Sequence, residues 1–201
     1  MKEKFKNTSD VQLMLNFKEG DISSFEELIK RYKKSVINII YRFLGDRDEA
    51  ENLALEVFLR VYKSVKKYRA RAKFTTWLYK IAVNLSLSEL KKKRKHFSIS
   101  LNTPIIKDKG GFRELIDDVA DPSPPPEKIL EEKERNFLIK KAISLLPPGQ
   151  RMAVILRIYE ELSYKEISKI LDCSVKSVES KLYRARTNLK KKLQSYFEIE
   201  S

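Results

Sequence analysis

The chain has little of what catalytic and disulfide-linked proteins use: one histidine, one cysteine and five glycines in 201 residues. A single cysteine, Cys173, excludes a disulfide within the chain and fits a reducing compartment. His96 stands alone, and no clustered metal-ligand spacing accompanies it. We therefore expect no metal, no cofactor and no catalytic residues. The scarcity of glycine also argues against many tight hairpins.

Long apolar runs are absent as well. No segment approaches the roughly 18 apolar residues that a membrane-spanning helix needs. The basic residues 1–6 have no apolar segment behind them, so no signal peptide is visible. We expect a cytoplasmic protein without direct membrane insertion.

What the chain does have is positive charge: 42 lysines and arginines against 28 acidic residues, a net charge of +14. The excess is concentrated in residues 91–95 and 190–192. A surplus of this size favours a polyanionic partner such as nucleic acid. The alternative is a soluble basic protein with no such partner.

Apolar residues recur at helical spacing on both sides of a proline-rich stretch. The predicted helix starts and stops in the first half are Asp10 to Gly20, Ser23 or Ser24 to Gly45, Asp46 with Glu49, and Thr75 or Thr76 ahead of a helix from Trp77. Residues 97–126 contain most of the prolines and lack a period, which predicts a flexible linker, with residues 112–116 as the only hint of local structure. The fold prediction is all-α: two small helical domains, residues 1–96 and 127–201, joined by that linker.

Residues 162–182 have helix-turn-helix spacing. Ser163 can cap the first helix with Glu166 three residues on, and the turn falls at residues 172–174. Polar and basic residues on the second helix suit a major groove. They are Lys176, Ser177, Glu179, Ser180, Lys181, Tyr183, Arg184 and Arg186. The alternative is an ordinary helical hairpin with a solvated basic face.

Cations and aromatics alternate between residues 68 and 95, a pattern that suits single-stranded nucleic acid because rings stack on bases while cations follow phosphates. Phe74 and Trp77 have two readings, core packing and base stacking, and for Trp77 both can apply. The preceding helix is acidic, with Asp46, Asp48, Glu49, Glu51 and Glu56, so it more naturally contacts a protein than DNA.

Residues 58–62 and 74–84 resemble region two of the extracytoplasmic-function (ECF, group four) sigma factors of the sigma-70 family. Residues 146–147, Arg151, 162–167 and 182–186 resemble their region four. Two ordered motifs at this separation, with a proline-rich linker between them, cover nearly the whole chain.

The resemblance implies partners: core RNA polymerase, through its β′ clamp helices and β subunit; promoter DNA, single-stranded at the −10 element and duplex at the −35 element; and an anti-sigma factor. The linker is implied to pass near the polymerase active site. The implied polymerase-docking residues are Asp48, Glu51, Asn52, Leu55, Glu56 and Phe58. The implied −10 residues are Tyr68, Arg69, Arg71, Lys73, Phe74, Thr75, Thr76, Trp77, Tyr79, Lys80, Asn84, Lys91 and Lys92. The helix-turn-helix residues named above would read the −35 element.

The sequence departs from the family pattern at four positions. Asn52 and Leu55 replace an acidic residue and a glutamine that are common on the docking helix, which makes that surface less polar. Lys176 stands where many members have glycine, and Glu179 where many have a cation. A carboxylate at this position repels phosphate or accepts a hydrogen bond from cytosine N4.

Two other functions compete with the sigma-factor reading. A stand-alone helix-turn-helix regulator would need no reader of single strands. An enzyme acting on nucleic acid has little support from one histidine and one cysteine. For Cys173, packing as a small apolar group competes with redox sensing.

Overall fold

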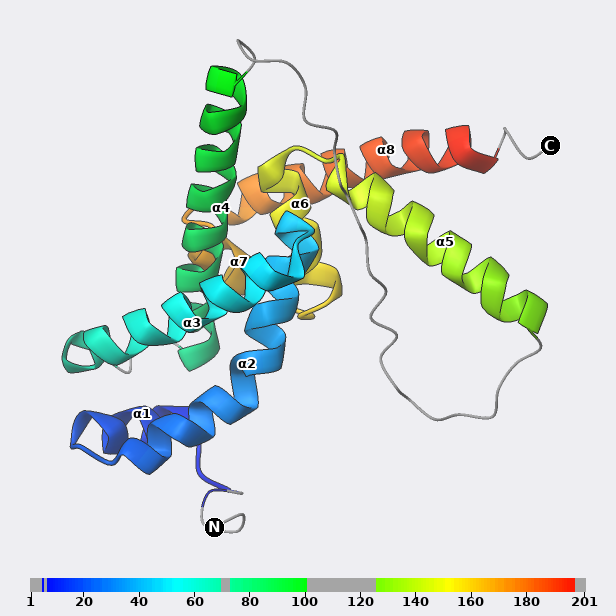
Figure 1. Ribbon diagram of the computed structural model, residues 1–201. Helices are drawn as coiled ribbons and strands as arrows, with labels where there is room; N and C mark the ends of the chain where they lie inside the picture. The colour runs from blue at the N-terminus through cyan, green and yellow to red at the C-terminus, as the bar shows by residue number, and fades with distance from the viewer. Residues whose placement is uncertain (1–4, 6, 70–72, 101–125, 198–201) are drawn as a thin grey trace.

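The computed structural model describes residue 5 and residues 7–69, 73–100 and 126–197. Every regular element in these ranges is a helix, which confirms the all-α prediction (Figure 1). In the same ranges, no helix combines the length and the apolar character needed to cross a bilayer.

The first half contains α1 (Asp10–Lys18), α2 (Ile22–Leu44), α3 (Arg47–Ser64), a short 3-10 turn (Val65–Lys67) and α4 (Phe74–Ser100). The second half contains α5 (Pro126–Ser144), α6 (Pro148–Ile158), α7 (Tyr164–Ile170) and α8 (Val175–Phe197). Helix α4 therefore extends four residues into the predicted linker, and α5 begins at its last residue. Residues 101–125, which include the predicted local structure at 112–116, lie outside the described residues.

Several helix boundaries follow the sequence signals. Gly45 ends α2 in the left-handed region (φ 84°), where glycine has no steric penalty, and its N–H bonds the Tyr41 carbonyl at 2.7 Å. The Asp46 carboxylate accepts from the Glu49 N–H at 2.9 Å and starts α3. Both halves of the predicted capping box at Ser163 and Glu166 are present at the start of α7.

Three predicted starts were wrong by a few residues. Ser9, not Asp10, caps α1, and Asp21, not Ser23 or Ser24, caps α2 by accepting from the Ser23 N–H at 3.1 Å. Helix α4 begins at Phe74 rather than Trp77, with no cap from the threonines. Phe74 is only 1% exposed, so burial of its ring sets the first turn of the helix instead of a hydroxyl cap.

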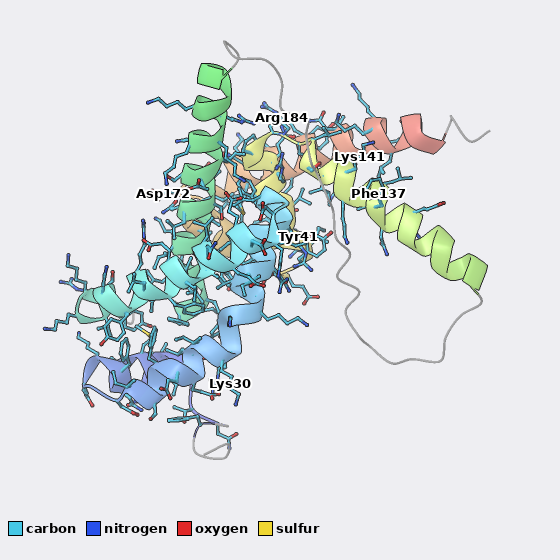
Figure 2. The ribbon with its side chains drawn as sticks, viewed as in Figure 1. Lys30, Tyr41, Phe137, Lys141, Asp172 and Arg184 are labelled. Carbon is cyan, nitrogen blue, oxygen red and sulfur yellow. The ribbon has the colours of Figure 1, made fainter. Side chains whose placement is uncertain are left out.

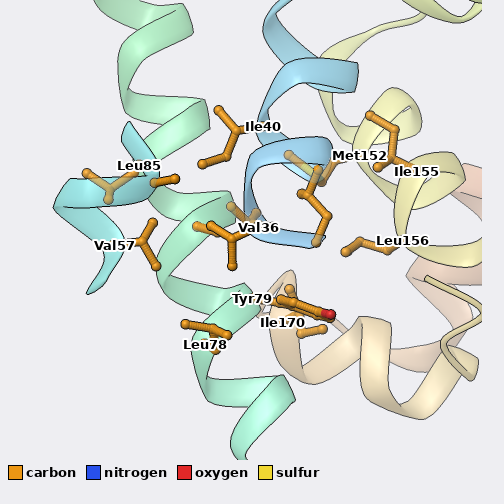
Figure 3. Close-up of a cluster of buried hydrophobic side chains, with 14 of the residues drawn as sticks. Val36, Ile40, Val57, Leu78, Tyr79, Leu85, Met152, Ile155, Leu156 and Ile170 are labelled. Carbon is orange, nitrogen blue, oxygen red and sulfur yellow. The ribbon is translucent and has the colours of Figure 1, made fainter. Parts of the chain in front are cut away.

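The two halves share one apolar core. Figure 3 shows Val36 and Ile40 of α2 and Leu78 of α4 in the same cluster as Ile155 of α6 and Ile170 of α7. All five side chains are almost completely buried. The domains that the sequence predicts as separate units on a linker therefore pack directly against each other.

Arg151 of α6 links the halves through backbone carbonyls. Its guanidinium donates to the Phe43 carbonyl at the end of α2 at 2.8 Å, and to the carbonyls of Ser144 and Leu146. Phe43 lies in the last turn of α2, where carbonyls lack partners within the helix. Burial, with Arg94 as a second cause, lowers the pKa of Arg151, but arginine keeps its charge at any ordinary pH.

We expect Arg151→Ala to lower the free energy of unfolding by about 1–3 kcal/mol, because it leaves several carbonyls without their donor. Arg157→Ala is the matched control, since Arg157 is exposed and donates to a single carbonyl, that of Leu162 at 3.0 Å. Its cost should stay below about 1 kcal/mol. Urea denaturation of both variants measures the difference, and equal losses would contradict this role for Arg151.

Candidate nucleic-acid and polymerase interfaces

Helix α8 presents a solvent-facing polar surface. Val178, Leu182 and Ala185 are buried against the other helices, which turns the remaining side chains outward. The left-handed backbone of Asp172 (φ 53°) makes the turn before α8, and the Ser174 hydroxyl caps the helix by accepting from the Ser177 N–H at 3.1 Å. The sequence thus places the second helix of the motif as predicted.

All eight residues predicted to read the −35 element are exposed or half-buried. Five of them line one shallow hollow at the start of α8: Lys176, Ser177, Ser180, Lys181 and Arg184. Glu179, Tyr183 and Arg186 lie outside the hollow, and Tyr183 is 73% exposed.

Gln150 of α6 also lines the hollow, and its side-chain oxygen accepts from Asn188 at 3.0 Å. The sequence analysis missed it because nothing in the local pattern brings the start of α6 to α8. The Pro147-Pro148 helix start before it was the only available signal.

The predicted −10 residues divide by burial. Tyr68, Phe74, Thr76 and Tyr79 are buried, so none of them is available to stack on a base in this arrangement. Thr75, Trp77 and Lys80 are half-buried, and Arg69, Lys73, Asn84, Lys91 and Lys92 are exposed. Arg71 lies outside the described residues.

Trp77 packs against two other rings without being fully buried. Its ring packs 5.3 Å from the Tyr68 ring and 6.2 Å from the Phe74 ring, centroid to centroid. Part of the indole nonetheless remains accessible. Core packing and base stacking are therefore compatible at this position.

Two lysines pair with carboxylates of the second half: Lys73, directly before α4, and Lys80 within α4. Lys73 Nζ lies 2.8 Å from Glu166 Oε1, and Lys80 Nζ lies 3.3 Å from Asp172 Oδ1. Figure 2 shows Asp172 beside α4 and Arg184 on α8. Hydrogen bonds from Lys73 and Ser163 lower the pKa of Glu166 to about 2. The pair therefore stabilises the fold fully above the usual glutamate pKa of 4.5, and loses that contribution only as the pH falls towards 2.

A third carboxylate, that of Glu160, accepts from the hydroxyls of half-buried Ser35 and buried Tyr79. Glu160 Oε2 accepts from Ser35 Oγ at 2.5 Å and from the Tyr79 phenol at 3.1 Å, and the two hydroxyl oxygens lie 2.8 Å apart. Burial raises the pKa of Tyr79, which keeps its phenol protonated and able to donate. No sequence pattern predicts this contact, because the partners are 81 to 125 positions apart.

The docking surface on α3 is partly apolar. Leu55, Leu59 and Tyr62 are 65%, 44% and 48% exposed and follow one side of the helix. We call these three residues the α3 stripe. Leu55 is one of six predicted docking residues. Four others, Asp48, Glu51, Asn52 and Glu56, are exposed or half-buried near it, while the sixth, Phe58, is 6% exposed and packs inward. Leu59 and Tyr62 were not predicted as site residues, although their spacing from Leu55 signals the stripe.

Among the described side chains, no group of three or more histidines, cysteines, aspartates or glutamates is arranged to hold a metal ion. Cys173 is half-buried and packs against the apolar core, as a small apolar group would.

Comparison with known proteins finds two family regions in the chain. Residues 28–96 match the model of sigma-70 region 2, and residues 136–189 match the model of sigma-70 region 4. The chain is 30% identical to the ECF RNA polymerase sigma factor SigW of Bacillus subtilis, over 88% of this chain and 92% of that protein. It is also 30% identical to the RNA polymerase sigma-H factor of Pseudomonas aeruginosa, over 92% and 94%.

A solved structure shares the fold. The sigma factor RpoE of Bartonella quintana, in complex with the anti-sigma factor NepR, superposes with a TM-score of 0.64 at 20% identity, over 85% of this chain and 96% of that one. Two sigma-70 regions in order, and relatives matched over almost their full length, lead to one conclusion: the chain belongs to the ECF sigma factors of the sigma-70 family.

Proposed function

We propose that this chain directs core RNA polymerase to its promoters by reading duplex DNA with α8 and unpaired DNA with the segment from Tyr68 to Lys92. The observation that carries the proposal is the presence of both sigma-70 regions in one chain, with the polar face of α8 open to solvent. A stand-alone helix-turn-helix regulator would need only a surface for duplex DNA. The chain would act in the cytoplasm, where the polymerase is, without catalysis of its own.

The α3 stripe supports docking on another protein. Exposed apolar side chains bordered by charge mark protein interfaces. On α3 the neighbouring charged side chains form ion pairs along the helix: Arg47 pairs with Glu51 at 2.7 Å, and Arg60 pairs with Glu56 at 2.8 Å. We infer that this surface docks on the β′ clamp helices, as the family resemblance implies.

An anti-sigma factor is a further proposed partner. It is supported by the shared fold with the Bartonella quintana protein, whose solved structure contains the anti-sigma factor NepR. A basic, partly apolar protein with two DNA-reading faces offers such an inhibitor large surfaces to cover.

Transcription from genomic DNA by purified core polymerase tests the proposal as a whole. Adding the chain should produce transcripts that start at a limited set of promoters. Binding to duplex DNA without any promoter-specific transcript would favour a stand-alone regulator and overturn the proposal.

Leu55→Glu should weaken binding to core polymerase by about tenfold, because it places an unpaired charge in an apolar contact. Leu145→Glu is the matched control, since Leu145 is 52% exposed directly after α5, away from the α3 stripe. Fluorescence titration of labelled variants with core polymerase gives both affinities. Equal losses would argue against docking through α3.

Arg184→Ala should weaken binding to the −35 element by about 1–3 kcal/mol if the guanidinium reads a base. Arg184→Lys separates two roles, because lysine keeps the charge for a phosphate but lacks the planar fork that pairs with guanine. Loss with both variants indicates base reading. Loss with alanine alone, equal on every sequence and with a smaller salt slope, indicates a phosphate contact.

Trp77→Ala should impair open-complex formation on duplex promoters, while initiation on pre-melted promoters should remain near normal. The reason is that the accessible part of the indole would hold unpaired bases, each worth roughly 1–3 kcal/mol. Permanganate footprinting measures the melting. Trp77→Phe is the control for packing against Tyr68 and Phe74, and circular dichroism should show both variants folded. Global unfolding of Trp77→Ala would instead assign the residue to the core alone.

A further inference from the structure

The shallow hollow at the start of α8 is lined by one residue of another helix. Gln150, in the first turn of α6, lines it together with Lys181 and Arg184 of α8. The proposed reading of duplex DNA uses residues of α8 alone, so Gln150 has no part in it. Its place among these cations asks for a role of its own.

Four polar side chains of α8 form a line beside the start of α6. They are Ser177, Lys181, Arg184 and Asn188. Because they are spaced four, three and four residues apart, they lie on one side of the helix. The two helices approach closely here, since a methyl group on Gly149 would lie 3.4 Å from Lys181 Cε. The start of α6 is therefore packed against the polar line of α8.

Asn188 fixes the orientation of the Gln150 amide. Asn188 Nδ2 donates to Gln150 Oε1 at 3.0 Å. Among the described residues, none accepts from Gln150 Nε2, which carries two hydrogens. Gln150 is half-buried and lines the hollow, so a ligand that enters the hollow can accept these hydrogens.

The donors that remain on Gln150 suit a phosphate better than a base. Glutamine reads adenine by using its oxygen and its nitrogen together, on N6 and N7. The Gln150 oxygen is already engaged by Asn188, which leaves the nitrogen alone. Phosphodiester oxygens only accept hydrogen bonds, and the neighbouring Lys181 and Arg184 favour an anion.

The position of Gln150 on α6 favours the DNA backbone for a second reason. In a helix-turn-helix protein the recognition helix enters the major groove, and side chains of the helices beside it meet the phosphates at the edge of the groove. Helix α8 is the one proposed to enter the groove. Gln150 lies beside that helix and not on it.

We propose that Gln150 is a phosphate-binding residue of the duplex interface, donating from Nε2 to the DNA backbone at the edge of the −35 element, and that Asn188 is the positioning residue that orients its amide. The inference rests on the proposed function, because that function assigns duplex DNA to α8. It extends the interface from one helix to two. The added contact is independent of base sequence and carries no charge.

A neutral donor has a signature in salt titrations that a cation lacks. A lysine or arginine on a phosphate releases counterions, so losing it weakens binding and reduces the salt slope. Losing a neutral donor weakens binding by the same factor at every salt concentration. Gln150→Ala should therefore weaken duplex binding by about threefold, on every sequence and with an unchanged slope.

Two charged substitutions test whether a phosphate lies next to Gln150. Gln150→Lys should bind duplex DNA about threefold more tightly at low salt, with a slope steeper by about one, because a cation then meets the phosphate. Gln150→Glu should bind on the order of tenfold more weakly, because a carboxylate repels the phosphate.

The matched control carries the same two substitutions at Gln12. This glutamine is exposed on α1 and also pairs with an amide, since its Nε2 donates to Asn16 Oδ1 at 2.8 Å. Helix α1 lies apart from α8 (Figure 1). The control variants change the net charge equally, but their charges are screened at that distance, so their affinities should stay within about twofold of the wild type.

Asn188→Ala tests the positioning role. Alone, it should weaken duplex binding by about twofold, because the Gln150 amide is then free to turn. Added to Gln150→Ala, it should cause no further loss, since the two residues act as one unit. Additive losses would contradict the positioning role of Asn188.

The measurement is fluorescence anisotropy of a fluorescein-labelled duplex of about 30 base pairs, titrated with the full-length chain from about 50 to 300 mM NaCl. The duplex is one that the wild-type chain selects from a random-sequence pool. A scrambled duplex of the same length shows whether each change in affinity depends on sequence. Thermal unfolding followed by circular dichroism compares the stability of the variants.

Unchanged affinities for the three Gln150 variants would overturn the inference. A loss confined to the selected duplex would also overturn it, because Gln150 would then read a base. The tighter binding expected for Gln150→Lys cannot result from unfolding, which keeps the test decisive if Gln150→Ala is unstable. A wild-type chain that selects no duplex would instead overturn the proposed duplex reading, so the two failures are distinguishable.

Discussion

The packing of α7 against α4 determines how the rest of the molecule is presented to its partners. Ile170 and Leu78 are both buried where these helices meet, and the hydroxyl pair of Ser35 and Tyr79 is satisfied by Glu160 at the edge of the same contact. A buried phenol needs such a partner, because an unpaired polar group in the core is costly. The orientation of the halves therefore depends on the acceptor that the second half supplies.

The two surfaces proposed to bind DNA differ in how far helix packing buries them. Among the side chains of α8 up to residue 194, Val178, Leu182 and Ala185 are buried, and the polar side of the helix faces solvent. Helix α4 packs against α2, α3 and α7, which buries Phe74, Leu78 and Tyr79 and leaves Trp77 partly accessible. Packing, and not the chemistry of the residues, therefore sets how much of each proposed surface is accessible.

Local sequence signals were sufficient to predict a helix end where one residue hydrogen-bonds to backbone groups close to it in the chain. Gly45, Asp46 and Ser163 end or begin helices as predicted, because each satisfies a backbone group within four residues of itself. The predictions were wrong where burial competed with capping. The ring of Phe74 draws three extra residues into the start of α4, and no hydroxyl pattern reveals that.

The sequence by itself determined the all-α class, the exposed face of α8 and the family, because periodicity and short motifs encode local structure directly. Only the tertiary structure decided that Phe58 and Tyr79 face the core, that Leu59 and Tyr62 extend the α3 stripe, and that Gln150 joins the hollow at α8. It also chose core packing over base stacking for Phe74. It alone paired Lys73 with Glu166, 93 positions apart. The physical reason is that contacts between distant segments depend on how whole helices pack, and no short stretch of residues carries that information.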